Sequence, residues 1–386
     1  MKKLLSDKIV SIPPSGIRKY FDAAAMMKGV VSLGVGEPDF ATPEKIREAG
    51  KRSLDAGQTG YTSNSGLTEL RKEISNYVKR TSGVEHCPEK EVLVTVGGSE
   101  AIDNTLRCIL NSGDEVLLPE PAFVSYHPLT IMAGGTPVTI PLKNENDFKL
   151  TLEELQEYTT PKTKALILSF PNNPTGAVMT REDLAPLVDF IIENDIYVIS
   201  DEIYAELTYT GEPHVSIASF PGMRERTVII NGFSKGFAMT GWRLGWVSGP
   251  QVIIEQVLKL HQYAVMCAPT TAQHAAIVAL TQCDEDVKYM RDAYNERRQF
   301  LVKEFARLGL PCFEPFGAFY MFPSIKKFGL TSDEFATRLL EEQKLALVPG
   351  DAFGASGEGF LRISYAYSME ELQEAIVRLE RFIQAL

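Results

Sequence analysis

Cysteine and histidine are scarce in this sequence, and the few present are not arranged for metal or redox chemistry. There are five of each among 386 residues, with no C-x-x-C pair and no H-E-x-x-H string. These absences argue against a disulfide framework and against a dedicated metal site. They favour a reducing, cytoplasmic setting in which the thiols are small core residues.

The sequence also lacks long basic runs and membrane-type apolar runs. The net charge is -11 and the pI is near 5.2, so nucleic acid and anionic membrane surfaces are not expected as main partners. Ser6-Asp7-Lys8 directly follows Lys2-Lys3-Leu4-Leu5, which leaves no room for a signal peptide. The uncharged stretch 265–283 contains Pro, His, Thr and Gln and is too polar to span a bilayer. We expect a soluble protein.

Apolar, strand-like runs alternate with helical patterns through the middle of the chain. The runs are residues 91–96, 115–118, 165–170, 196–200 and 227–230. Helical patterns lie between several of these runs. Ser99 is expected to be the N-cap of the helix that follows the first run. Residues 151–158, which open with a Thr-x-x-Glu capping box, and residues 180–194 are expected to form two more helices. This alternation predicts an α/β fold with a mostly parallel sheet covered on both faces.

The pattern changes near residue 285. Residues 286–308 form a long charged helical pattern, and residues 317–322 and 360–365 are strand-like. Ser368 and Glu371 are spaced as a capping box for the last helix. We therefore expect a large domain at 45–285 and a smaller α+β domain formed by 286–386 together with 1–44.

Residues that could contact a ligand follow each of the five central runs. In open parallel sheets, ligands bind beyond the carboxyl ends of the strands. Taken alone, the first, second and fourth clusters are more simply a glycine turn, a core aromatic and a helix cap or surface ion pair. The third could be a Pro/Asn turn, but its six-residue string is far more constrained than most turns need. No complete G-x-G-x-x-G or P-loop is present, so a dinucleotide or nucleoside triphosphate site has little support. In order, the clusters are Gly97-Gly98-Ser99, Pro119 to Phe123, Pro171 to Gly176, Asp201 to Tyr204, and Ser234-Lys235 with Arg243.

Lys235 and Asp201 carry the strongest chemical signal. Lys235 follows a buried run and has small and apolar neighbours, so lost hydration should lower its pKa from about 10.4. A lysine of this kind can trap a carbonyl compound as a Schiff base. Asp201, at the end of an apolar run, is costly unless it meets a cation such as a protonated ring nitrogen.

The other strand ends supply the rest of a site for pyridoxal 5'-phosphate (PLP). Gly98 and Ser99 begin a helix, whose free N–H groups suit a phosphate. Phe123 could stack on a planar ring, and Tyr204 could bind a ring oxygen. Asn173 lies in a loop that two prolines make rigid, so its amide is presented at a defined place.

At these residues the chain resembles the class I/II PLP-dependent aminotransferases of fold type I. The resemblance covers essentially the whole chain. Within the family, residues 15–19, 347–350 and 357–359 look similar to the N-acetyl-diaminopimelate type of the aspartate/aromatic/N-acetyl-diaminopimelate branch. The most specific strings are Pro171-Asn172-Asn173-Pro174-Thr175-Gly176, Ser200-Asp201-Glu202-Ile203-Tyr204, and Ser234-Lys235 followed by Gly241-Trp242-Arg243-Leu244-Gly245.

The resemblance implies a large domain with a seven-stranded, mostly parallel sheet, and a cofactor role for each matching residue. Lys235 carries the cofactor as an imine and later moves a proton. Asp201 pairs with the ring nitrogen. Further contacts fall to Asn173 and Tyr204 at the ring hydroxyl, Phe123 on the ring face, and Gly98, Ser99, Ser234 and Arg243 at the phosphate.

The resemblance also implies substrate contacts and a homodimer. Arg362 clamps the substrate α-carboxylate, with Asn173 and the Gly36 backbone alongside. Tyr61 reaches the phosphate of the neighbouring subunit. At Gly232 many relatives carry a hydroxyl residue, so one phosphate contact is in question here. Residues 12–20, Tyr320 and the partner are expected to shape the pocket for the substrate side chain.

The implied activity is transfer of an amino group from an L-amino acid to a 2-oxo acid, expected to be 2-oxoglutarate. Aspartate, aromatic, alanine and acylated diaminopimelate donors all remain open. A carbon-sulfur β-lyase of the same fold is the main alternative. A cofactor-binding regulator would need a DNA-reading extension and a basic surface. A degenerate scaffold is opposed by the intact lysine, aspartate and arginines.

Overall fold

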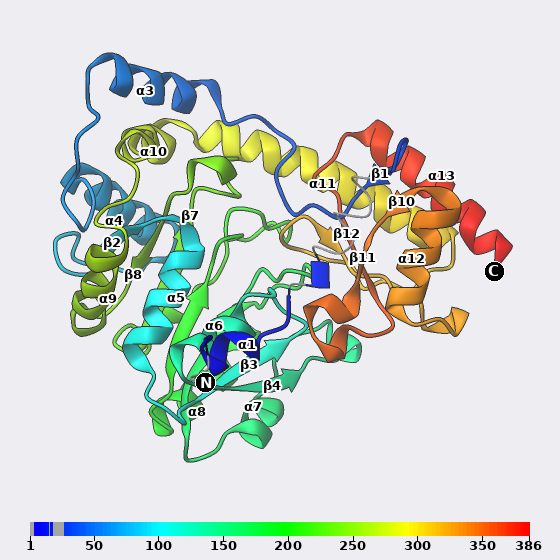
Figure 1. Ribbon diagram of the computed structural model, residues 1–386, viewed down its shortest axis with the longest axis horizontal. Coiled ribbons are helices and arrows are strands. Elements are labelled where there is room, and N and C mark those ends of the chain that lie inside the picture. Colours follow the sequence, from blue (N-terminus) through cyan, green and yellow to red (C-terminus); the bar gives the residue numbers. More distant parts are fainter. Residues whose placement is uncertain (1–3, 15, 18–26) are drawn as a thin grey trace.

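A seven-stranded sheet forms the centre of the computed structural model, which describes residues 4–14, 16–17 and 27–386 (Figure 1). Its strand order is β2-β8-β7-β6-β5-β3-β4. β8 runs antiparallel to both of its neighbours, and the other pairings are parallel. The predicted mostly parallel sheet is therefore confirmed. The strands are β2 (Val92–Thr95), β3 (Glu115–Glu120), β4 (Thr136–Pro141), β5 (Thr163–Ser169), β6 (Tyr197–Asp201), β7 (Thr227–Gly232) and β8 (Gly245–Ser248).

Helices cover both faces of this sheet. One face packs against α5 (Gly97–Ile109), α6 (Tyr126–Ala133) and α9 (Gln251–Ala264). The other packs against α4 (Thr68–Ser82) and α10 (Thr270–Gln282) at one end, and α7 (Leu152–Tyr158) and α8 (Arg181–Glu193) at the other. α3 (Glu44–Asp55) packs on α10. Because both faces are buried, the central strands are nearly continuous apolar runs.

A second group of elements lies beside the sheet (Figure 1). The long helix α11 (Asp284–Arg307) leads into it from α10. A three-stranded antiparallel sheet has the order β11-β12-β9, and β1 pairs in parallel with β10. The remaining elements are α1 (Asp7–Val10), β1 (Val31–Ser32), β9 (Tyr320–Met321), α12 (Ser332–Gln343), β10 (Leu345–Ala346), β11 (Val348–Pro349), β12 (Leu361–Ser364) and α13 (Met369–Ala385).

The helix starts show which capping predictions hold. The capping boxes at Thr151 and Ser368 are present, and Thr180 caps α8 in the same way. The predicted N-cap at Ser99 is wrong, because α5 already begins at Gly97. The Glu100 carboxylate accepts a hydrogen bond from the backbone N–H of Val96, the residue before the helix, and no side chain in the described part of the chain caps the first turn of α5. Ser99 thereby lies in the first turn of α5, where its N–H group is free for a ligand.

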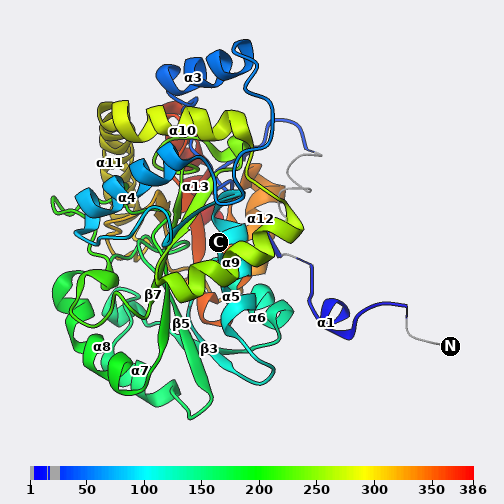
Figure 2. The same ribbon diagram turned by 90° about the vertical axis from the view of Figure 1, so that its left-hand side faces the viewer.

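Near the N-terminus, α1 packs against α6, and residues 4–6 before it extend away from the sheet (Figure 2). The expected pocket segment 12–20 is only partly covered, because Ser15, Arg18, Lys19 and Tyr20 lie outside the described residues. Among the residues that are described, no helix is long and apolar enough to cross a membrane.

Candidate active site

A cavity of about 370 Å³ lies at the carboxyl ends of β2, β3, β5, β6 and β7. Because these strands are parallel, the residues that follow them meet at one edge of the sheet. Two residues from outside the sheet, Gly36 and Arg362, close the cavity from the side of β1 and β12. The predicted site residues that line it are Gly36, Gly98, Ser99, Phe123, Asn173, Asp201, Tyr204, Ser234, Lys235, Arg243 and Arg362.

The Lys235 amine projects into this cavity, where it donates a hydrogen bond to the Gly36 carbonyl. Burial first, and then the nearby Arg362 and Arg243 guanidinium groups, lower the pKa of Lys235 to about 8, against the opposing effect of Glu37 and Asp201. With a pKa of about 8, roughly a tenth of the amine is uncharged at pH 7. The uncharged amine is the form that attacks a carbonyl.

Asp201 is the last residue of β6 and only 5% exposed. Burial raises the pKa of its carboxyl to about 6, against hydrogen bonds that favour the charged form. Oδ2 accepts from the Tyr126 hydroxyl at 2.7 Å, and Oδ1 accepts from the Ile203 N–H at 3.2 Å. A carboxylate held in this way suits a positively charged partner such as a protonated ring nitrogen.

Arg362 lies on β12 and is buried. It donates to Asn173 Oδ1 at 3.0 Å and to the Gly34 carbonyl. Its Nε is buried and has no partner among the described residues. A guanidinium that lines a cavity and keeps unused donors fits a ligand carboxylate.

The opposite end of the cavity is suited to a phosphate. Gly98 and Ser99 lie in the first turn of the thirteen-residue helix α5, where N–H groups are free and the helix dipole favours an anion. Gly97 has φ +78°, and a Cβ there would come within 2.8 Å of Arg243 Nη2. The glycine therefore lets the guanidinium approach the start of the helix closely.

Aromatic side chains line the middle of the cavity. The Tyr204 and Tyr320 hydroxyls are 2.7 Å apart, and the Lys235 amine lies 5.7 Å from the centre of the Tyr204 ring. Phe123 packs edge-on against Tyr126, with ring centres 5.6 Å apart. A flat ligand that lies between Phe123 and Lys235 would have the Phe123 ring against one of its faces.

Two predicted positions lie away from the cavity lining. Tyr61 is 83% exposed and does not line the cavity of its own subunit. Gly232 is the last residue of β7; a Cβ there would lie 3.0 Å from Gly245 Cα and 3.1 Å from the Leu244 carbonyl oxygen. A hydroxyl residue at 232 would therefore require β7 and β8 to shift apart.

Sequence reasoning missed several residues of this site. Tyr126 and Ser169 lie beneath Asp201, and Glu37 and Thr240 form a hydrogen-bonded pair at the rim. Tyr126 had a usable signal, because it follows Phe123 by three positions and can face the same way at a helix start. Ser169 also had one, since it ends β5 beside Asp201 in the next strand.

The fold and site together define a PLP-dependent enzyme of fold type I, and comparison with known proteins identifies the family. The family model for aminotransferases of class I and II matches residues 28–379. The chain is 51% identical to the putative aminotransferase YugH of Bacillus subtilis, with 99% of each chain covered. It is 50% identical to the aspartate aminotransferase of Pyrococcus abyssi, with 98% of each covered. The crystal structure of an aromatic aminotransferase from Pyrococcus horikoshii matches with a TM-score of 0.91 at 47% identity, over 95% of this chain and 99% of that one.

This chain belongs to the class I and II aminotransferase family, whose members use PLP. It is a PLP-dependent transaminase that acts on amino acid and 2-oxo acid substrates. The comparisons contain nothing that favours the carbon-sulfur lyase alternative.

Proposed function

We propose that Lys235 holds PLP, that Asp201 pairs with its ring nitrogen, and that Arg362 binds the substrate α-carboxylate. Lys235, whose pKa is lowered to about 8, lines the same cavity as Asp201 and Arg362, and the Arg362 Nε has no partner among the described residues. That convergence carries the proposal. When bound, PLP supplies an electron sink that allows the substrate Cα–H bond to break.

The protein's own residues orient the reactants and move the proton. Arg362 fixes the substrate carboxylate, with Asn173 and the Gly36 backbone alongside, so that the Cα–H bond is held in one direction. Once substrate has displaced it from the cofactor, the Lys235 amine, with Nζ next to the Gly36 carbonyl, would take the proton from the substrate Cα and would later give that proton up to the cofactor. Asp201, when ionised, would stabilise a positive charge on the ring nitrogen of bound PLP.

We assign the phosphate to Gly98, Ser99, Ser234 and Arg243, the ring hydroxyl to Asn173 and Tyr204, and the ring face to Phe123. The free N–H groups at the start of α5 and the adjacent Arg243 support the first assignment. The short distance between the Tyr204 and Tyr320 hydroxyls keeps Tyr204 oriented to donate or accept at the ring.

We propose that the protein is a homodimer in which Tyr61 completes the partner's phosphate site. Tyr61 is exposed in the single subunit. Tyr263, Val265 and Met266, which lie near it in space, are exposed as well. Asn64 donates to the Met266 carbonyl at 2.8 Å, which joins the Tyr61 loop to this apolar surface. Large exposed apolar side chains gathered in this way are typical of a subunit interface.

We propose two domains, 45–285 and 286–386 with 1–44. One hydrophobic cluster draws mainly on residues beyond 285, and the β1–β10 pairing, Val31 with Leu345, attaches the N-terminal segment to that part. We also propose a cytoplasmic location, supported by five cysteines that are all unpaired.

For the substrates, we propose aspartate or an aromatic amino acid as donor and 2-oxoglutarate as acceptor. The names of the relatives support both donor classes. Among the described residues, the lining offers the cations Lys235, Arg243 and Arg362, and each already has a role in the proposal. A distal carboxylate would therefore need a cation from the partner or from residues 15–26.

A donor panel tests this choice. Purified holoenzyme is mixed with 2-oxoglutarate and aspartate, phenylalanine, tyrosine, alanine or N-acetyl-diaminopimelate, and glutamate formation is measured. We expect the highest kcat/KM for aspartate or an aromatic donor. Higher values for alanine or the acylated donor would contradict the substrate proposal, and no glutamate from any donor would contradict 2-oxoglutarate as acceptor.

A further inference from the structure

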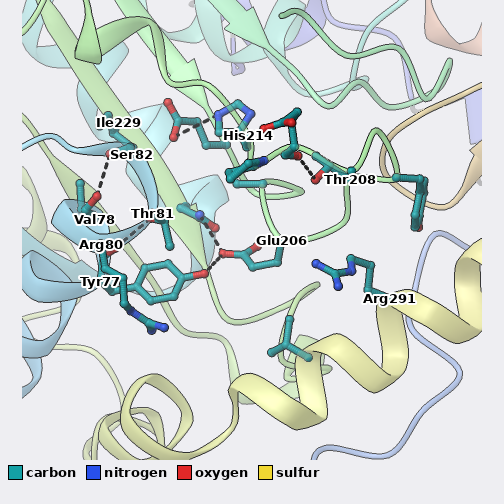
Figure 3. Close-up of a pocket in the computed structure, with 18 of the residues that line it drawn as sticks. Tyr77, Val78, Arg80, Thr81, Ser82, Glu206, Thr208, His214, Ile229 and Arg291 are labelled. Atoms are coloured by element: carbon teal, nitrogen blue, oxygen red, sulfur yellow. Dashed lines mark hydrogen bonds and ion pairs between the residues drawn. The ribbon is translucent and has the colours of Figure 1, made fainter.

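A second cavity, of about 550 Å³, lies behind the active site and shares no lining residue with it. Its walls come from α4, from the loop after β6, from β7 and β8, and from α11. Figure 3 shows side chains from these walls around the hollow. The volume is in the range typical of sites for small ligands, about 300–1,000 Å³.

The wall between the two cavities is thin. Asp201 faces the active site, whereas the next residue, Glu202, lines the second cavity. A Cβ added at Gly236, directly after Lys235, would come within 2.9 Å of Glu206 Oε2. The second cavity therefore begins on the back of the segment that carries Lys235.

Glu206 presents an unsatisfied acceptor in this wall. Its Oε1 accepts from the Tyr77 hydroxyl and from Asn231 Nδ2, the latter at 3.4 Å (Figure 3). Its Oε2 is buried and has no partner among the described residues. Burial raises the pKa of this carboxyl. The Glu206 side chain as a whole is half-buried in the cavity wall, so its carboxylate can accept hydrogen bonds from a ligand that enters the cavity.

Arg291 presents the opposite charge. It extends from α11 towards Glu206 from the other wall of the hollow (Figure 3). In the described part of the chain its ion pair is with the adjacent Asp292, at 3.4 Å. A guanidinium has five N–H donors, so most remain available for an anionic group.

The remaining charges favour a ligand that also carries a cation. Four carboxylates line the cavity, Glu202, Glu206, Glu212 and Asp292, against two arginines. Of the two arginines, Arg80 is already paired with Asp284 at 2.5 Å. An inorganic anion would meet the excess of negative charge. Within the described residues, no group of three or more His, Cys, Asp or Glu could hold a metal ion.

We propose that this cavity binds a free amino acid, with its ammonium group on Glu206 and its carboxylate on Arg291. Two facing walls of opposite charge match the two ends of such a zwitterion, and Tyr77 and Trp246 add aromatic side chains to the lining. The site is separate from transamination, because neither charged residue lines the cavity that contains Lys235.

The test separates this site from the active site. The holoenzyme carrying Arg362→Leu, which lacks the proposed carboxylate partner in the active site, is screened with each of the standard L-amino acids by saturation-transfer NMR. Calorimetry then gives the stoichiometry for those that bind. We expect at least one to bind, at one molecule per chain. Methylammonium and acetate, each with one of the two charges, should bind more weakly.

Three further substitutions in the same background locate the site. Glu206→Gln and Arg291→Gln should each weaken binding about tenfold or more, the effect of losing one charge-assisted hydrogen bond. Arg80→Gln is the matched control, since its partner is Asp284, and should leave binding nearly unchanged. Failure of every amino acid to bind, or equal binding in all three variants, overturns the proposal. Both results are independent of catalytic activity.

Discussion

The Tyr126 hydroxyl donates a hydrogen bond to Asp201 Oδ2 at 2.7 Å and lies within 2.8 Å of Ser169 Oγ. Tyr126 is 3% exposed, so the contact is shielded from water. This hydrogen bond counteracts the effect of burial, which raises the pKa of the Asp201 carboxyl to about 6. Tyr126 therefore helps to keep Asp201 ionised at neutral pH.

Replacing Tyr126 by Phe should raise the pKa of Asp201 further and weaken PLP binding at pH 7. A hydrogen bond to a charged group is worth about 1.5–3 kcal/mol, so the Kd for PLP should rise about tenfold or more. Affinity should recover in part at pH 8.5, where Asp201 ionises again. Equilibrium dialysis at both pH values measures this. Equal losses at both would contradict it, and Ser169→Ala should have a smaller effect.

The pH dependence of PLP uptake by the apoenzyme should report Lys235. Because the uncharged amine reacts, the rate should rise with pH through about 8 and then level off. Arg362→Leu removes a cation and should move the midpoint up, whereas Glu37→Gln removes an anion and should move it down. Stopped-flow absorbance measures the rates. A wild-type midpoint near 10.4, or shifts of both variants in one direction, would contradict this explanation.

Asp201→Asn should stabilise the apoenzyme in a pH-dependent way. The folded-state pKa of about 6 lies above the ordinary 3.8, so the folded protein holds an extra proton between these values. Its free energy of unfolding therefore falls as pH rises through this window, by about 3 kcal/mol in all. The free energy of unfolding of the asparagine variant does not fall in this window, because asparagine has no carboxyl group to ionise. Urea unfolding of both proteins from pH 4.5 to 7.5 should show that the difference between their free energies of unfolding grows up to pH 6–7. A difference that stays constant with pH would contradict this prediction.

Two inactive variants should restore activity when combined, if Tyr61 serves the partner subunit. In a mixed dimer of Lys235→Ala and Tyr61→Ala chains, one of the two sites has both native residues. Random mixing of equal amounts should give about one quarter of wild-type activity, given that a two-fold dimer exchanges equivalent contacts. Co-refolding and assay test this. A monomer by light scattering, or no recovery of activity, would argue against the dimer contact.

The parts of the fold that the sequence predicts are those with strong local signals. β2, β5, β6 and β7 lie within a residue or two of the predicted runs, because buried parallel strands are continuously apolar. The expected strand 317–322 shortens to Tyr320–Met321, since its neighbour β12 pairs only briefly. The runs alone did not reveal β4, whose Thr136–Pro141 contains two prolines.

The candidate site also contains residues that the sequence predicts and residues that it does not. Lys235, Asp201 and Asn173 follow strands that the sequence marks, so their meeting at one edge was predictable. Arg362 and Gly36 come from distant parts of the chain, and only the family resemblance indicated their place. The second cavity could not be foreseen, because Glu206 and Arg291 resemble ordinary surface charges until α11 is packed against the sheet.

Reduction of the holoenzyme with borohydride, followed by peptide mapping, tests the central claim most directly. The account predicts a stable pyridoxyl group on the peptide containing Lys235 and loss of transaminase activity in proportion to labelling. Label on another lysine, or no label after incubation with PLP, would contradict it.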